Sequence, residues 1–177
     1  MKIQYLMLTL LLATPAIAGP NQIDILGLIP GVSDSEDIKR VAVRDGGRAV
    51  MLEIGGHSLP CIPSYIDNKL SGLVCLTGKN GGTRYTDESN TTIHVELWAG
   101  FAKKFGKVDA IDKSRVRTVL GSEHEKSTVM WKDKKGNILR LVSIFDSVTS
   151  GAIEMYSNEH LKNHAENRAT REANKKF

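Results

Sequence analysis

The sequence KSTVMWKDKKGNILRLVSIF, residues 126–145, decides the fold class because two apolar stretches flank a tight polar turn. Lys126–Lys132 and Asn137–Phe145 contain the β-branched and aromatic residues that favour strands. Between them, Asp133-Lys134-Lys135-Gly136 supplies a glycine for a backbone position with positive φ. The pattern predicts an antiparallel hairpin.

Other apolar stretches bounded by turn residues predict further strands. They are Ile23–Ile29, Ala49–Ile54, Leu70–Leu76, Arg115–Leu120 and Gly151–Tyr156. Cys61 lies between Pro60 and Pro63, so we expect an irregular segment there rather than a strand. A Gly-rich loop, Gly78–Thr83, follows the third of these stretches.

Three segments have helical patterns. Ser33 with Glu36 three residues later predicts a capping box, and this first helix should end near Asp45. The second helix is expected to begin at Asn90 and to end at Gly106. It carries an apolar residue at every fourth position, Ile93, Leu97, Phe101 and Phe105.

The last helix should begin at Ser157 or Asn158 and run through Lys176. Its apolar stripe is thin, since Leu161 is followed at helical spacing only by alanines. Such a helix lies loosely on a domain, projects into solvent or frays. We therefore predict an α+β fold, an antiparallel sheet with two helices packed on one face and a C-terminal polar helix. The domain would comprise residues 19–157, with similar halves 19–86 and 87–157, and the polar helix residues 158–177.

Residues 1–18 have the pattern of a secretory signal peptide. Lys2 precedes the apolar stretch Tyr5–Ala13, Pro15 breaks it, and Ala16-Ile17-Ala18 provides small residues for cleavage. The apolar stretch is too short to span a bilayer, which takes about 20 residues. We expect a periplasmic or secreted protein with no stable membrane insertion after cleavage.

Cys61 and Cys75 are the two cysteines of the chain. In an oxidising compartment an even pair is most simply a disulfide. The enclosed loop of about 15 residues would stabilise the fold by roughly 3 kcal/mol in the chain-entropy model. The alternative, a reactive thiol pair, lacks the Cys-x-x-Cys spacing.

The net charge of +4 does not demand nucleic acid, and export also argues against such a partner. One group of basic residues is nevertheless a candidate surface for an anion or a protein partner. It comprises Lys103, Lys104, Lys107, Arg115 and Arg117. The alternative interpretation is that these side chains are ordinary solvated positions on a helix and a hairpin.

No motif predicts catalysis, a metal or a cofactor. His160 and His164 share a helix face, but two ligands are too few for a stable zinc site. A small secreted hydrolase is the alternative function, with a site assembled from scattered residues such as His57, His94 and an acid.

Ile29-Pro30-Gly31-Val32-Ser33, followed by an acidic helix start, resembles the opening of small envelope domains of the BamE/SmpA family. Those domains are similar in shape to β-lactamase inhibitor proteins. The chain has Gly19-Pro20 where that family carries a lipidated cysteine. The segments 101–107 and 131–137 also resemble a helix and hairpin common in periplasmic proteins. The resemblance implies a periplasmic α+β interaction domain.

The first functional hypothesis is therefore an exported, disulfide-containing binding protein that is not an enzyme. Its partner would be a protein or an anionic envelope polymer, and inhibition of an envelope enzyme is one concrete form. The second is the hydrolase. The third is a structural accessory of an envelope machine that docks through its last helix.

Overall fold

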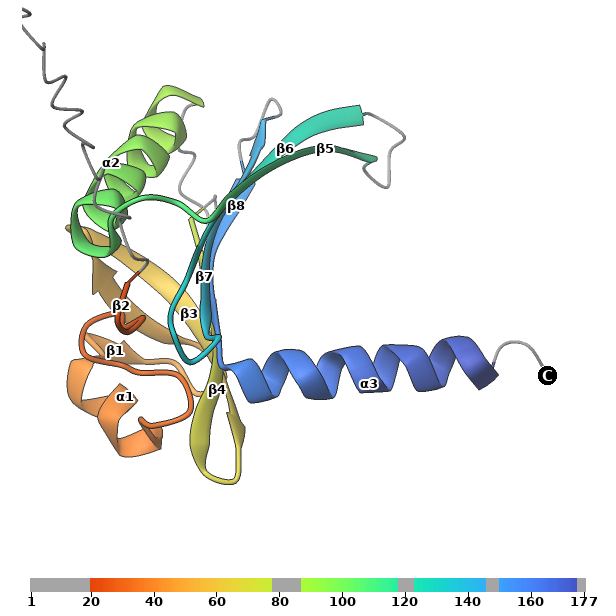
Figure 1. The fold of residues 1–177 in the computed structure, drawn as a ribbon. Coiled ribbons are helices and arrows are strands. Elements are labelled where there is room, and N and C mark those ends of the chain that lie inside the picture. The colour runs from red at the N-terminus through yellow and green to blue at the C-terminus, as the bar shows by residue number, and fades with distance from the viewer. Residues whose placement is uncertain (1–19, 78–86, 118–122, 146–149, 175–177) are drawn as a thin grey trace, which may run out of the picture.

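An eight-stranded antiparallel sheet forms the centre of the protein, which this computed structural model describes over residues 20–77, 87–117, 123–145 and 150–174 (Figure 1). The class is α+β, as the hairpin pattern predicted. The expected leader, residues 1–18, and the Gly-rich loop 78–83 lie outside the described residues. In chain order the elements are α1 (Ser35–Val41), β1 (Arg44–Asp45), β2 (Val50–Ile54), β3 (His57–Ile66), β4 (Lys69–Leu76), α2 (Asp87–Phe105), β5 (Ala110–Arg117), β6 (Glu123–Lys132), β7 (Ile138–Phe145), β8 (Ser150–Tyr156) and α3 (Asn158–Asn174).

The strand order β1-β2-β3-β4-β8-β7-β6-β5 is symmetric about its centre. In each half of the chain a helix precedes four strands, and each strand pairs with the next along the sequence. β4 and β8, the last strand of each half, pair with one another from Gly72–Tyr156 to Leu76–Ala152. The sheet therefore places the ends of both halves side by side.

The core consists of rows of apolar side chains that cross the sheet. One row joins Leu73, Met155, Leu139 and Trp131, all fully buried. α2 covers this row with Phe101 and Phe105, whose rings lie 5.9 and 6.5 Å from that of Trp131. The Trp131 indole N–H donates to the Gly106 carbonyl at 3.1 Å, so the polar atom of this buried ring is satisfied.

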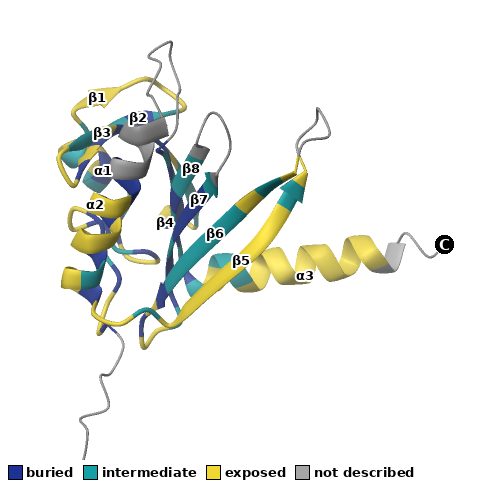
Figure 2. Ribbon diagram, turned by 90° about the horizontal axis from the view of Figure 1, so that it is seen from above, coloured by how far each residue is buried: buried dark blue, intermediate teal, exposed yellow. Residues whose placement is uncertain are grey.

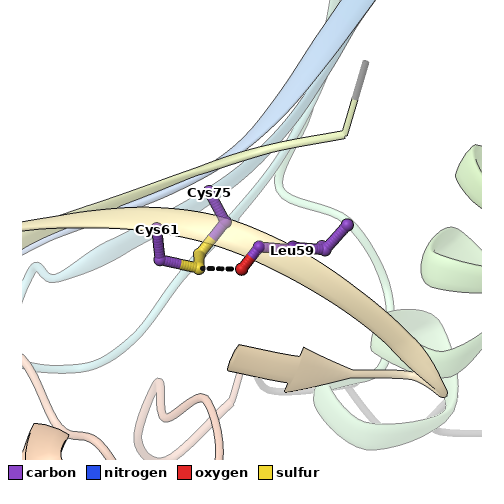
Figure 3. The surroundings of a disulfide bond; sticks show 3 residues. All are labelled: Leu59, Cys61 and Cys75. Carbon is purple, nitrogen blue, oxygen red and sulfur yellow. Dashed lines mark hydrogen bonds between the residues drawn. A yellow bond between two sulfur atoms is a disulfide. The ribbon is translucent and has the colours of Figure 1, made fainter. Parts of the chain in front are cut away.

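The Cys61–Cys75 disulfide predicted from the sequence is present and joins β3 to β4 (Figure 3). Both cysteines are fully buried in the next row of the core, beside Ile153 of β8. The Leu59 carbonyl lies 3.5 Å from the Cys61 sulfur, a contact without a proton because both sulfurs are bonded.

Cys61 lies within strand β3, so the expectation of an irregular segment there was wrong; the register shift in β3 comes later, between Ser64 and Tyr65. β3 pairs with β2 over His57–Cys61 and with β4 over Cys61–Ile66, and only Cys61 has both neighbours. Pro60 is therefore opposite β2 alone and Pro63 opposite β4 alone. Proline has no N–H to donate to a neighbouring strand. It is therefore tolerated where its nitrogen faces a side of the strand that has no neighbour.

The expected strand at Ile23–Ile29 is also wrong. The segment forms one isolated bridge, Ile25–Leu28, because Leu26 and Gly27 reverse the chain with φ values of 54° and 80°. Ile23, Ile25 and Leu28 are nevertheless buried, so the segment contributes core side chains without joining the sheet.

The first helix has the predicted capping box, shifted by one residue. The N-cap is Asp34, whose carboxylate accepts from the backbone of Asp37, and the Asp37 carboxylate accepts from the Asp34 N–H. That backbone hydrogen bond lowers the pKa of Asp37 below its usual value. Ser33 instead accepts from the Ile29 N–H, and the helix ends at Val41, four residues before Asp45.

Three further boundaries differ from the prediction. α2 begins at Asp87, so Asn90 lies within the helix rather than at its N-cap. β5 spans Ala110–Arg117 instead of beginning at Arg115, and residues 118–120 lie outside the described residues. β6 begins at Glu123, three residues early, because it pairs along the whole of β5.

Candidate functional site

The five predicted basic residues fall into two groups. Lys103, Lys104 and Lys107 lie at the end of α2 and just beyond it, whereas Arg115 and Arg117 lie at the far end of β5. Seven residue steps of β5 separate Ala110 from Arg117, about 24 Å in an extended strand. The structure therefore does not gather the five residues into one patch.

Several of these cations already have acidic neighbours. The Lys104 ammonium lies 2.6 Å from Asp24 and 5.3 Å above the Phe105 ring centre. Arg115 lies 3.7 Å from Glu123. Such pairs at the surface are weak, about 0–1 kcal/mol, so an anionic partner could displace them.

His94 is buried at the centre of a hydroxyl network. Its Nε2 lies 2.8 Å from Thr77 Oγ1 and its Nδ1 lies 2.8 Å from Ser143 Oγ. Burial lowers the pKa of His94 from 6.5 to about 4, so the ring is neutral near neutral pH. Because hydroxyl groups occupy both ring nitrogens, no carboxylate can hold this histidine as in a triad.

His57 belongs to a different network. Its Nε2 lies 2.8 Å from Glu96 Oε2 on α2, and its side chain is only 24% exposed. Ser58 follows it in β3 and therefore points to the other face of the strand. The scattered residues of the hydrolase hypothesis are thus a surface His–Glu pair and a separate buried His–hydroxyl cluster.

A third group of side chains meets where α3 leaves the sheet, and sequence reasoning missed it. Along each strand, the residues between the core residues point to the opposite face of the sheet, which we call the open face. One half-buried row across this face consists of Val74, Glu154, Arg140 and Met130. α3 extends away from this face (Figure 1). Side chains of β7, β8 and α3 line a pocket of about 410 Å³ where the helix leaves the sheet. We call it the corner pocket; its lining is Arg140, Tyr156, His160, Leu161, His164, Ala165 and Arg168.

The start of α3 is fixed by contacts to two distant segments. The Ser157 N–H donates to the Ser71 carbonyl at 2.8 Å, and its hydroxyl accepts from the His160 N–H as an N-cap. The Asn158 N–H donates to the Asn137 side-chain oxygen at 3.0 Å. Asn137 is itself held by Asp133, whose carboxylate accepts from its backbone and side-chain nitrogens.

The His160 ring completes this anchor. It stacks on Tyr156 with ring centres 4.8 Å apart, and its Nδ1 lies 3.3 Å from the Ser71 hydroxyl. Gly72 makes room for Tyr156, since a Cβ at that position would lie 2.9 Å from the tyrosine ring. Beyond this first turn, residues 162–172 of α3 are exposed (Figure 2).

The pocket has a basic and aromatic lining. Arg140 lies 3.6 Å from Glu154, its cross-strand neighbour, and Arg168 lies 2.9 Å from Glu172 one turn along α3. Burial, and next the neighbouring His164, lowers the pKa of His160. The spacing of His160, His164 and Arg168 at every fourth residue was visible in the sequence, but Arg140 and Tyr156 were not linked to it.

The chain was compared with protein-family models, with curated proteins and with solved structures, and none of the three comparisons finds a match. Within the described ranges, no three His, Cys, Asp or Glu side chains form a group that could hold a metal ion. No helix in the same ranges is long and apolar enough to cross a membrane.

Proposed function

We propose that the protein is exported and acts in the periplasm or outside the cell as a binding protein without catalytic activity. The leader pattern of residues 1–18 supports export, and the buried Cys61–Cys75 disulfide suits an oxidising compartment. The partner is a protein in the first instance, and an anionic envelope polymer is the alternative.

The open face of the sheet carries this proposal. We infer that α1 and α2 pack on one face, since Ile38 of α1 and Phe101 of α2 belong to one core cluster. The opposite face then presents half-buried Val74 and Met130, with Ile62 50% exposed. The Arg140–Glu154 pair lies between these apolar side chains, and a surface that mixes apolar residues with arginine suits a protein partner.

Two projecting elements border this face. The β5–β6 hairpin and α3 both project on the side away from α1 and α2, the hairpin above and α3 below in the view of Figure 1 (Figures 1 and 2). β5 is exposed at every residue but Val116, and α3 is exposed beyond its first turn. Elements that bury so little of their own surface suit contact with a partner, and α3 could serve as a docking arm.

A residue-specific cross-link tests the proposal. A photoreactive amino acid at Met130 on the open face should capture a discrete partner from envelope extract. The same group at Val95, which is 56% exposed on α2, should not. Capture from Val95 but not from Met130 would refute the assignment of the open face.

The lysine group at the end of α2 needs its own variant. Replacing Lys103, Lys104 and Lys107 with Glu should leave the Met130 cross-link in place if the open face is the contact surface. If this variant loses the cross-link while its melting temperature is unchanged, the contact surface is the end of α2 instead of the open face. Intact mass decides export, because a natively produced chain that still begins at Met1 in the cytosol would contradict it.

The hydrolase is the second candidate, and the His57–Glu96 pair favours it because a carboxylate can orient an imidazole base. The oxidised mature protein should then cleave ester, peptide or glycoside reporters, with activity lost in His57→Ala. We expect no cleavage above the buffer control, and turnover that depends on His57 would reverse the order of the two candidates.

A further inference from the structure

The corner pocket brings together arginine and histidine side chains from two elements that are far apart in sequence. Arg140 reaches it from β7, and His160, His164 and Arg168 reach it from α3. Among the residues that the structure describes, no carboxylate lines the pocket itself. Its volume of about 410 Å³ is within the range of small-ligand sites, about 300–1,000 Å³.

On the α3 side of the pocket, the lining side chains form a row along the helix. His160, His164 and Arg168 are four residues apart, so their side chains share one face of α3 at intervals of about 6 Å. Arg140 lies across the angle on the sheet. Donors that approach from two directions suit a tetrahedral oxyanion better than a planar carboxylate, for which one guanidinium is enough.

Both arginines of the pocket have a carboxylate beside them. Glu154 beside Arg140 and Glu172 beside Arg168 offset both guanidinium charges. The remaining groups facing the pocket are the Tyr156 phenol and the two imidazoles. An anion that enters the pocket therefore competes with Glu154 and Glu172 for the two guanidinium groups.

We propose that the corner pocket binds a phosphate monoester group, held between Arg140 on the sheet and His164 and Arg168 on α3. The inference rests on the proposed function, because it names the ligand chemistry at one end of the open face. The phosphate is carried by a soluble molecule, an envelope polymer or a lipid headgroup, which present the same oxygens to the pocket.

Calorimetric titration of the oxidised mature protein with glycerol 3-phosphate at pH 6 tests the proposal. Arg168→Gln should weaken binding about 10-fold or more, because a charged hydrogen-bond donor is lost. Glu172→Gln should strengthen it about 2- to 5-fold, because Arg168 loses its competing partner. Both substitutions lie on the exposed part of α3, so neither should unfold the domain.

Lys162→Gln is the matched control, because Lys162 is exposed on α3 and lies about 160° round the helix from His164. It removes the same charge as Arg168→Gln without touching the pocket. Equal losses in the two variants would overturn the proposal, since binding would then follow net charge alone. Absence of saturable binding at millimolar glycerol 3-phosphate would also overturn it.

Inorganic sulfate is a tetrahedral anion that keeps its charge between pH 8 and 5.5, so its binding does not depend on titration of the ligand. His164→Ala should weaken sulfate binding, because one side chain that lines the pocket is lost. Unchanged sulfate binding in this variant would contradict the assigned row.

Two comparisons identify the source of the anion. Binding to phosphatidic acid vesicles but not to glycerol 3-phosphate assigns the phosphate to a lipid headgroup, and the reverse assigns it to a soluble molecule or polymer. Tighter binding of oligoglutamate than of any phosphate would overturn the ligand class. If phosphate binding fails while the Met130 cross-link persists, the proposed function stands without this inference.

Discussion

Acidification should loosen the attachment of α2 to the sheet through one residue, His94. The ring lies in the core between Thr77 of the segment after β4 and Ser143 of β7, and it is only 8% exposed. It packs directly over Gly151 of β8, where a Cβ would collide with it. Protonation would place a charge there without an acidic partner on either nitrogen.

The direction and size of the change in the free energy of unfolding follow from the pKa of His94, which is about 4 in the folded protein against 6.5 for an exposed histidine. The unfolded chain binds the proton first, so stability is complete above pH 6.5 and is lost as the pH falls through 4. The loss amounts to roughly 2 kcal/mol between pH 7 and pH 5, and roughly 3 kcal/mol by pH 4.

Urea unfolding followed by far-UV circular dichroism at several pH values measures this loss. His94→Gln is the comparison, since an amide bonds to both hydroxyls but does not titrate. The wild type should lose about 2 kcal/mol more than the variant between pH 7 and pH 5. Parallel curves for the two proteins would refute the buried neutral histidine.

Four other changes have calculable outcomes. Reduction of Cys61–Cys75 should lower the free energy of unfolding by about 2–4 kcal/mol, measured by urea unfolding with and without reductant. Gly151→Ala should destabilise by about 1–3 kcal/mol because the methyl group meets the core, whereas Gly100→Ala, which meets open space within α2, should stabilise by about 0.5–1 kcal/mol. Asn137→Ala should cost about 1–3 kcal/mol and increase amide exchange in the first turn of α3.

The sequence was informative where a local pattern determines local structure. The hairpin of β6 and β7 followed from two apolar stretches and one glycine, which has the predicted positive φ at Gly136. The disulfide followed from an even cysteine pair in a chain that begins with the sequence pattern of a leader. In both cases the relevant residues are close in the chain.

The sequence-based predictions failed where pairing between strands or the backbone conformation overrides the usual local preference of a residue. Pro60 and Pro63 usually argue against a strand, yet the staggered ends of β2 and β4 leave each proline with only one neighbouring strand. Leu26 has positive φ, a conformation that leucine rarely adopts, and so the apolar segment around it bends instead of pairing.

The corner pocket could not be derived from spacing because its two walls depend on how the halves of the sheet meet. Tyr156 of β8 lies opposite Gly72 of β4 only through the central β4–β8 pairing. That pairing places Tyr156 under His160, and the Asn137 side chain orients the α3 backbone. A periodic row on α3 therefore becomes a binding wall only after strands from both halves have fixed the angle of the helix.

The same dependence limits how the pocket can change without loss of function. The exposed turns of α3 can accept substitutions, since residues 162–172 contact little of the domain. The residues that anchor α3 cannot accept substitutions in the same way, because Ser71, Asn137 and Tyr156 each hold its first turn by a different contact. Variation along the exposed row would then alter which anion binds, whereas variation at the anchor would alter whether α3 faces the sheet at all.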